Sequence, residues 1–145
     1  EDELFQAPAL LKAKRTQAFE DVLLQYRQRQ GSIMASFARS SKWCESYLQV
    51  CRKLDELAQT LEDGAAKRAL KKRIGQIALS VGKNIPAYHL PQAVAREAME
   101  FLKKNRRELA GYALHSGDAV VAAQGVLLRL SPGAFVTSYD KAAGR

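Results

Sequence analysis

A helical spacing of apolar residues runs through most of this 145-residue chain and restricts its fold more than any other feature. The spacing is clearest between Lys42 and Asp63, where successive large apolar residues are separated by 4, 3, 4, 3 and 4 positions. Such steps place these residues on one side of an α-helix that packs nearly parallel to its neighbours. The stripe consists of Trp43, Tyr47, Val50, Leu54, Leu57 and Leu61.

The region before Lys42 follows the same period. We expect one long helix from about Ala9 to residue 40, because the apolar residues between Phe19 and Phe37 keep one register. Gly31 lies inside this run, where glycine costs a helix about 1 kcal/mol relative to alanine. The unbroken register favours a single kinked helix over two short ones.

The region after Asp63 predicts two further long helices. The first runs from Gly64 to residues 82–84 and ends before a connector, Ile85–Pro91, that contains two prolines. The second begins at Pro91, because proline is tolerated in the first turn of a helix, and ends near His115.

Two short elements are predicted near the C-terminus. Residues 116–118 indicate a turn and a helix cap, and residues 119–128 favour a short buried helix, with a strand as the alternative. Ser131 and Pro132 then indicate the start of a weak final helix that extends through Tyr139.

No alternating strand pattern persists anywhere in the chain. We therefore predict an all-α fold, a bundle of four to five main helices with a short C-terminal helix or tail. The length fits a single domain over residues 1–145, with frayed ends at 1–8 and 141–145. Because the chain begins at Glu1 rather than Met, we expect a processed product or a piece of a larger protein. The apolar stripes could close within one chain or pair between two.

The charge of the chain is distributed unevenly. The formal net charge is +8, yet residues 1–63 sum to −1 and residues 108–145 sum to zero. Residues 64–107 hold eleven basic and two acidic side chains, a net charge of +9. Nine of these basic residues form two clusters in the two long helices, and they are Lys67, Arg68, Lys71, Lys72, Arg73, Lys103, Lys104, Arg106 and Arg107.

These clusters are the candidate functional residues. Like charges three or four positions apart destabilise a helix, and surfaces that serve only solubility mix both signs. If the two helices are antiparallel neighbours, we expect one basic patch that binds the phosphate backbone of a nucleic acid. The alternative is a solvated helix surface, which is the usual origin of charge runs. Anionic lipid or an acidic protein surface would engage the same residues.

The leading hypothesis is a non-catalytic module that binds nucleic acid or another polyanion, as an accessory domain of a DNA-processing or DNA-transfer protein. No motif that reads bases is present, so we expect contacts to the backbone with little sequence preference. The second hypothesis is a protein-interaction or secretion-signal domain whose basic face is recognised by an acidic partner.

Catalysis and metal binding find little support in the sequence. The motifs GxSxG, HExxH, Walker A and GxGxxG are absent, and neither His89 nor His115 has a nucleophile or carboxylate tied to it by spacing. Cys44 and Cys51 would lie about 10.5 Å apart on one helix, too far for a disulfide. We expect buried free thiols, no enzyme, no metal and no cofactor.

The connector Ile85–Pro91 is a weaker candidate site. Tyr88 and His89 could contact a partner near the basic clusters, or Tyr88 could plug the end of the bundle. No apolar run reaches the roughly twenty residues of a membrane span. Two unpaired thiols favour a reducing compartment, so we expect a cytoplasmic protein.

Overall fold

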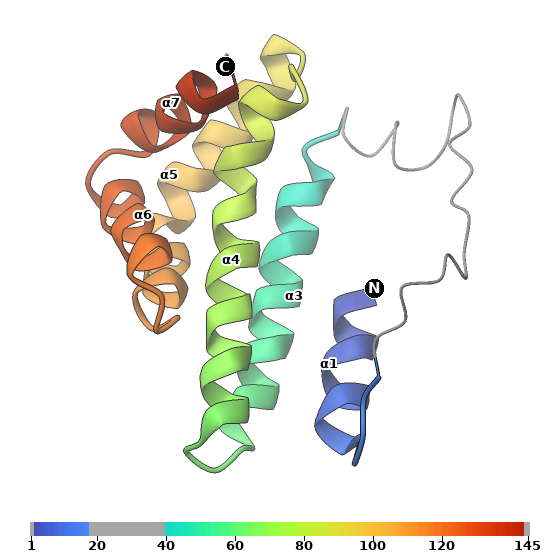
Figure 1. The fold of residues 1–145 in the computed structure, drawn as a ribbon. Coiled ribbons are helices and arrows are strands. Elements are labelled where there is room, and N and C mark those ends of the chain that lie inside the picture. Colours follow the sequence, from blue (N-terminus) through green and yellow to red (C-terminus); the bar gives the residue numbers. More distant parts are fainter. Residues whose placement is uncertain (1, 18–39, 144–145) are drawn as a thin grey trace.

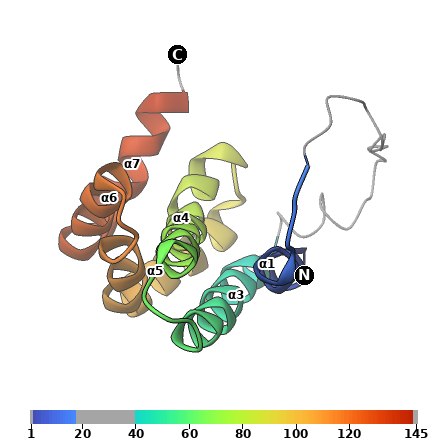
Figure 2. The ribbon, with the colours of Figure 1, turned by 60° about the horizontal axis from the view of Figure 1, so that its bottom comes forward.

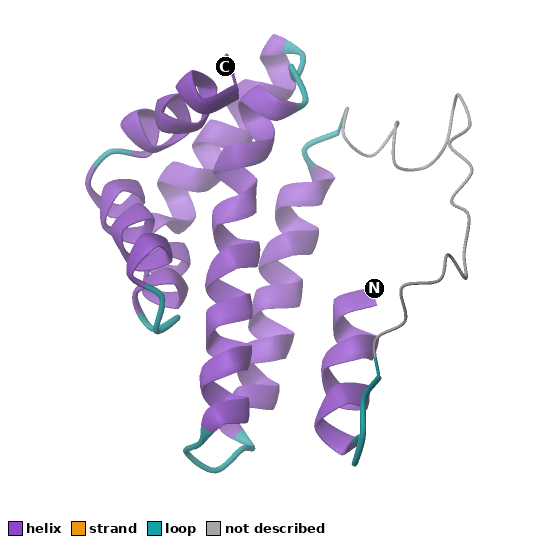
Figure 3. Cartoon of the chain, in the orientation of Figure 1, coloured by secondary structure: helices purple, strands orange, loops and turns teal. Residues whose placement is uncertain are grey.

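The computed structural model describes residues 2–17 and 40–143, and these contain helices and connections without a strand (Figure 3). The all-α prediction is confirmed, with slightly more helices than the four to five expected. The six helices of the described residues, labelled as in Figure 1, are α1 (Asp2–Lys12), α3 (Lys42–Gln59), α4 (Ala65–Ala87), α5 (Gln92–Leu114), α6 (Ala119–Leu130) and α7 (Pro132–Ala143).

Helix α4 is the centre of the bundle. It contacts α3, α5, α6 and α7, whereas α1 lies on the outer side of α3 (Figure 2). Short connections join α3 to α4 and α4 to α5, so α4 runs antiparallel to both (Figure 1). Its apolar residues are accordingly buried on several sides, and they include Leu70, Ile74, Ile77, Ala78, Leu79 and Val81.

Glycines in α4 and α6 allow the helices to approach closely. A Cβ atom on Gly82 would lie 2.1 Å from the ring of Phe135, which is 0% exposed. A Cβ atom on Gly125 would lie 2.6 Å from the Cβ of Ala113. The packing of α7 on α4, and of α6 on α5, therefore requires glycine at these two positions.

The buried side of α3 is rotated slightly from the predicted stripe. Cys44, Cys51 and Ala58, spaced by seven residues, are at most 1% exposed, whereas Tyr47 and Leu57 are only partly buried. These three side chains are small, so α4 can approach α3 closely along this side. The Cys51 thiol donates to the carbonyl oxygen of Ile74 in α4 at 3.7 Å.

Both predicted caps near the C-terminus are confirmed. The Asp118 carboxylate accepts hydrogen bonds from the backbone N–H groups of Val120 and Val121 at 2.9 and 3.1 Å. Gly117 precedes it with a φ of 70°, a conformation that glycine adopts without strain. At the next helix, the Ser131 hydroxyl accepts from the Ala134 N–H at 3.3 Å.

The connector between α4 and α5 is shorter than predicted. Helix α4 continues through Ala87 and includes Pro86, so only residues 88–91 connect the helices. Proline removes one N–H donor from the last turn, and the backbone bonding resumes where the Tyr88 N–H donates to the Asn84 oxygen at 3.1 Å. A proline near a helix end thus does not mark the boundary here.

Helices lie close to both chain ends, where we expected fraying over 1–8 and 141–145; that expectation stays a prediction, and residues 1, 144 and 145 lie outside the described residues. Residues 2–12 form α1 and α7 extends to Ala143, because α1 is tied to α4 by an ion pair and α7 packs on α4. Helix α1 ends at Lys12, and residues 13–17 are not helical. The remainder of the long helix expected from Ala9 falls mostly on residues 18–39, which lie outside the described residues.

Candidate polyanion-binding surface

The basic residues of α4 point in three directions rather than to one patch. We call Lys67, Arg68, Lys71, Lys72 and Arg73 the α4 cluster. Four of these five form ion pairs with acidic residues that come from other parts of the chain. Only Arg68 is exposed without an ion pair to the described residues.

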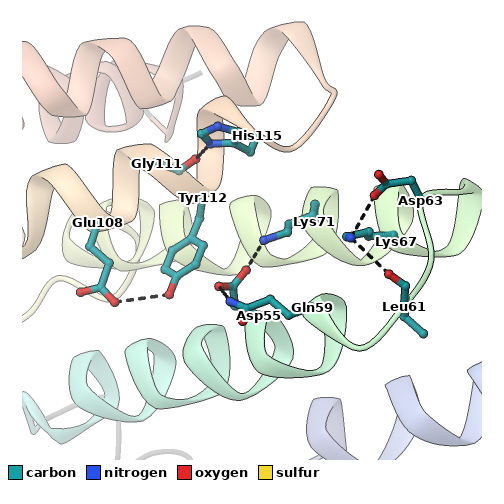
Figure 4. A network of polar contacts seen from close by, with 10 residues as sticks. All are labelled: Asp55, Gln59, Leu61, Asp63, Lys67, Lys71, Glu108, Gly111, Tyr112 and His115. Carbon is teal, nitrogen blue, oxygen red and sulfur yellow. Dashed lines mark hydrogen bonds and ion pairs between the residues drawn. The ribbon is translucent and has the colours of Figure 1, made fainter.

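Two lysines of the α4 cluster face the hairpin between α3 and α4 (Figure 4). The Lys67 ammonium lies 2.9 Å from an Asp63 carboxylate oxygen and donates to the Leu61 carbonyl oxygen at 3.1 Å. Lys71 pairs with Asp55 of α3, which also accepts a hydrogen bond from Gln59 at 3.0 Å. These contacts join α4 to α3 and occupy both ammonium groups.

The other two paired residues reach helices on different sides of α4. Lys72 contacts the Asp118 carboxylate at 3.0 Å, at the start of α6. The Arg73 guanidinium pairs with Glu3 of α1, its Nε lying 3.1 Å from both carboxylate oxygens. Each residue therefore links α4 to a further element.

The contacts lower the pKa values of three acidic partners, Glu3, Asp63 and Asp118. The hydrogen bond from Arg73 lowers the pKa of Glu3, and the hydrogen bond from Lys67 lowers that of Asp63. For Asp118 the backbone N–H of Val121 has the largest lowering effect on the pKa, followed by Lys72. All three carboxyl groups are therefore ionised at neutral pH and neutralise their partners.

The basic residues of α5 are arranged differently. Lys103, Lys104, Arg106 and Arg107, here the α5 cluster, are all exposed, and none forms an ion pair with residues 2–17 or 40–143. Lys103 and Arg107 lie one helical turn apart, as do Lys104 and Arg107, so their charges share one side of α5. Together with Arg68, these residues are the part of the predicted patch that forms no ion pair within the described residues.

Both clusters contribute a residue to the lining of one pocket. It has a volume of about 260 Å³ and lies between α3, α4 and α5, and Figure 4 draws its lining residues except Arg107. Helix α3 contributes Asp55 and α4 contributes Lys71. Helix α5 contributes Arg107, Glu108, Gly111 and Tyr112, and His115 follows directly after it. Lys71 and Arg107 are the members of the two clusters that line this pocket together.

A second polar group beside the pocket joins α3 to α5. Arg52 forms a bidentate contact with Glu108, with distances of 3.0 and 3.1 Å. The Tyr112 hydroxyl donates to the same carboxylate at 3.3 Å, and burial together with Glu108 raises the Tyr112 pKa. This contact could not be found from spacing, because Arg52 and Glu108 are 56 positions apart.

The weaker candidates, Tyr88 and His89, lie at the turn between α4 and α5. Tyr88 is 52% exposed, so the alternative in which it plugs the bundle is wrong. His89 is exposed and has a φ of 44°, and its N–H donates to the Pro86 oxygen at 3.2 Å. This turn is at the opposite end of α4 from the α4 cluster (Figure 1).

The cysteines and histidines are the remaining residues that the sequence analysis considered for chemistry. Cys44 and Cys51 are free and buried, as predicted, and burial raises the pKa of each thiol to about 12. His115 Nδ1 lies 2.8 Å from the Gly111 carbonyl oxygen. Within the described ranges no three His, Cys, Asp or Glu side chains gather as a metal site would require, and no helix has the length and apolarity to cross a membrane.

Comparison of the chain with protein-family models, curated proteins and solved structures finds no match.

Proposed function

We propose that this chain is a non-catalytic helical module that binds the phosphate backbone of a nucleic acid through the α5 cluster. The observation that carries the proposal is the contrast in pairing. Four cations occupy five consecutive positions of one exposed helix and have no acidic partner in the described part of the chain, while most of the α4 cluster is neutralised.

The like charges of the α5 cluster lower the stability of the helix, and this supports a functional role for them. Lys103 with Arg107 and Lys104 with Arg107 are like-charge pairs at helical spacing, each of which destabilises a helix by about 0.2–0.5 kcal/mol. Phosphates would relieve that repulsion and release their condensed counterions. Long side chains on a helix without a base-reading motif favour contacts with the backbone, as in an accessory domain of a DNA-processing protein.

The free thiols of Cys44 and Cys51 support a reducing, intracellular setting for such a module, because thiols are kept reduced there. An acidic protein surface would be attracted by the same four residues. That alternative predicts a specific protein partner, together with undetectable binding to a generic duplex at low salt.

Binding to a 20-base-pair duplex of arbitrary sequence, measured by fluorescence anisotropy between 50 and 200 mM salt, tests the proposal. Four phosphate contacts predict that log K falls against log salt with a slope of about −3 to −4. Lys103→Glu combined with Lys104→Glu should flatten the slope by about 2 and weaken binding for every sequence.

The matched control is Lys42→Glu combined with Arg129→Glu, which changes the net charge equally on exposed positions of α3 and α6. Its slope should stay close to that of the parent protein. Absence of binding at 50 mM salt, or an equal loss in the control, would overturn the proposal.

A further inference from the structure

Gly111 differs from the other glycines in the interior of the helices. Added Cβ atoms on Gly75, Gly82 and Gly125 would lie 3.0 Å or less from neighbouring atoms, so packing explains glycine at those positions. A Cβ atom on Gly111 would meet nothing within 4 Å. Glycine weakens a helix relative to alanine, and here no close packing compensates for that loss.

The missing side chain of Gly111 keeps a pocket open. Gly111 lines the pocket of about 260 Å³ between α3, α4 and α5, together with Lys71 and Arg107. A larger side chain at this position would extend into that space from the α5 wall. The pocket is therefore the feature that glycine at position 111 preserves.

The charged groups of the pocket are not equally engaged. Asp55 is bound by Lys71 and Gln59, and Glu108 is bound by Arg52 and Tyr112. Arg107, in contrast, is exposed and forms no ion pair with the described residues. The carboxylates are thus neutralised by internal partners, and an anion in the pocket would meet the free guanidinium.

His115 adds a polar ring nitrogen to the same pocket. Its Nδ1 is 2.8 Å from the Gly111 carbonyl oxygen, and because a carbonyl only accepts, Nδ1 carries the proton. Nε2 is then left for a ligand, as an acceptor when the ring is neutral and as a donor when it is protonated. This suits a group that has both anionic and hydroxyl oxygens.

We infer that this pocket binds a phosphate monoester, and that its source is the terminal phosphate of a nucleic acid strand lying along the α5 cluster. The assignment of the source rests on the proposed function, whereas the monoester site does not. Arg107 belongs to both the pocket and the α5 cluster, so a strand held by the cluster brings its end to the pocket. A monoester carries a charge of about −1.5 to −2 and three terminal oxygens, more than a backbone phosphodiester offers to the same donors.

The experiment compares two single strands of one sequence, one with a 5′-phosphate and one with a 5′-hydroxyl, each labelled at the 3′ end. For the parent protein we expect the phosphorylated strand to bind on the order of tenfold more tightly, because charge-assisted hydrogen bonds are strong. Gly111→Leu fills the pocket with a good helix former, and it should abolish this preference while leaving the affinity for the 5′-hydroxyl strand unchanged.

Gly133→Leu is the matched control. It adds the same side chain at another helical glycine whose Cβ would meet nothing within 4 Å, in the first turn of α7 and away from the pocket. This variant should keep the preference for the phosphorylated strand. Circular dichroism of both variants verifies that they fold.

A second measurement separates the possible sources of the phosphate. Inorganic phosphate is titrated into ¹⁵N-labelled protein, and we expect shifts of the Gly111 and Tyr112 amides that disappear in Gly111→Leu. Such shifts without an end preference would uphold the monoester site and assign it to small phosphorylated molecules. Equal binding of the two strands together with unshifted amides would overturn the inference and leave the α5 cluster intact. Failure of both strands to bind would overturn the proposed function, and the titration alone would then decide the pocket.

Discussion

Two neighbouring helices carry similar numbers of basic residues and use them in different ways. In α4, Lys67, Lys71, Lys72 and Arg73 each contact an acidic residue, and these partners lie on α1, on α3, in the turn after α3 and at the start of α6. The α5 cluster has no such partners in the described residues. The cations of α4 connect the bundle, and those of α5 are presented to its surroundings.

Position in the bundle explains this difference. Helix α4 packs against α3, α5, α6 and α7 and is joined to α1 through Arg73, so its long basic side chains meet acidic residues nearby. Helix α5 contacts α4, α6 and α7, and Glu108 joins it to Arg52 of α3, whereas the side chains of the α5 cluster are exposed. A count of charges along the sequence weighs both clusters equally, whereas burial and pairing separate them.

The largest effect is expected from breaking the packing of α4, on which the comparison depends. Phe135→Ala removes a ring that is 0% exposed and lies against Gly82. It should lower the free energy of unfolding by about 3–5 kcal/mol in urea denaturation. Phe5→Ala, at a position 77% exposed, is the control and should change it by less than about 0.5 kcal/mol. A similar loss in the free energy of unfolding for both variants would contradict the central structural role of α4.

Acidification should weaken several connections of α4 together. The pKa values of Glu3, Asp63 and Asp118 are lowered in the folded chain from usual values of 4.5, 3.8 and 3.8. The unfolded chain then binds more protons in this range, so the stabilisation is complete above about pH 5 and is lost as the pH falls through the folded-state values. Thermal melting between pH 7 and 2.5 measures this.

The triple variant Glu3→Gln, Asp63→Asn and Asp118→Asn provides the control for that titration. Its melting temperature should be lower at pH 7 and should fall less between pH 5 and 3 than that of the parent protein. An unchanged acid response in the variant would contradict the structural role of the α4 pairs.

A smaller effect is expected when one cation of the α4 cluster is released. Asparagine is as good an N-cap as aspartate, so Asp118→Asn keeps the start of α6 and removes the charge partner of Lys72. The affinity of Asp118→Asn for a duplex should be about twofold higher than that of the control Asp140→Asn. The control makes the same charge change at an exposed position of α7. Equal affinities would show that pairing is not what restrains Lys72.

The two C-terminal helices α6 and α7 follow from local chemistry, which explains why the sequence predicts them, whereas α1 was not predicted over Asp2–Lys12. Asp118 caps α6 through its own neighbours, and Ser131 with Pro132 begins α7 in the same way. The predicted end of α4 at residues 82–84 was a few residues too early. Tertiary packing of Val81 and Gly82 keeps the helix intact through Pro86.

The functional surface could be predicted only in part. The basic residues are visible in the sequence, but their partners are not, since Lys71 pairs across 16 positions and Arg73 across 70. The pocket likewise joins Asp55 with His115, from helices far apart in the chain. Only the arrangement of helices in space distinguishes a compensated charge from an available one.

The most direct test compares two double variants of identical net charge. The α5 variant carries Lys103→Gln and Lys104→Gln, and the α4 variant carries Lys72→Gln and Arg73→Gln. We expect the α5 variant to lose about tenfold or more in affinity for a generic duplex at 50 mM salt, with an unchanged melting temperature. The α4 variant should lose about twofold or less and melt a few degrees lower, because exposed ion pairs contribute only modestly. Equal affinity losses in the two variants would contradict the division of roles between α4 and α5.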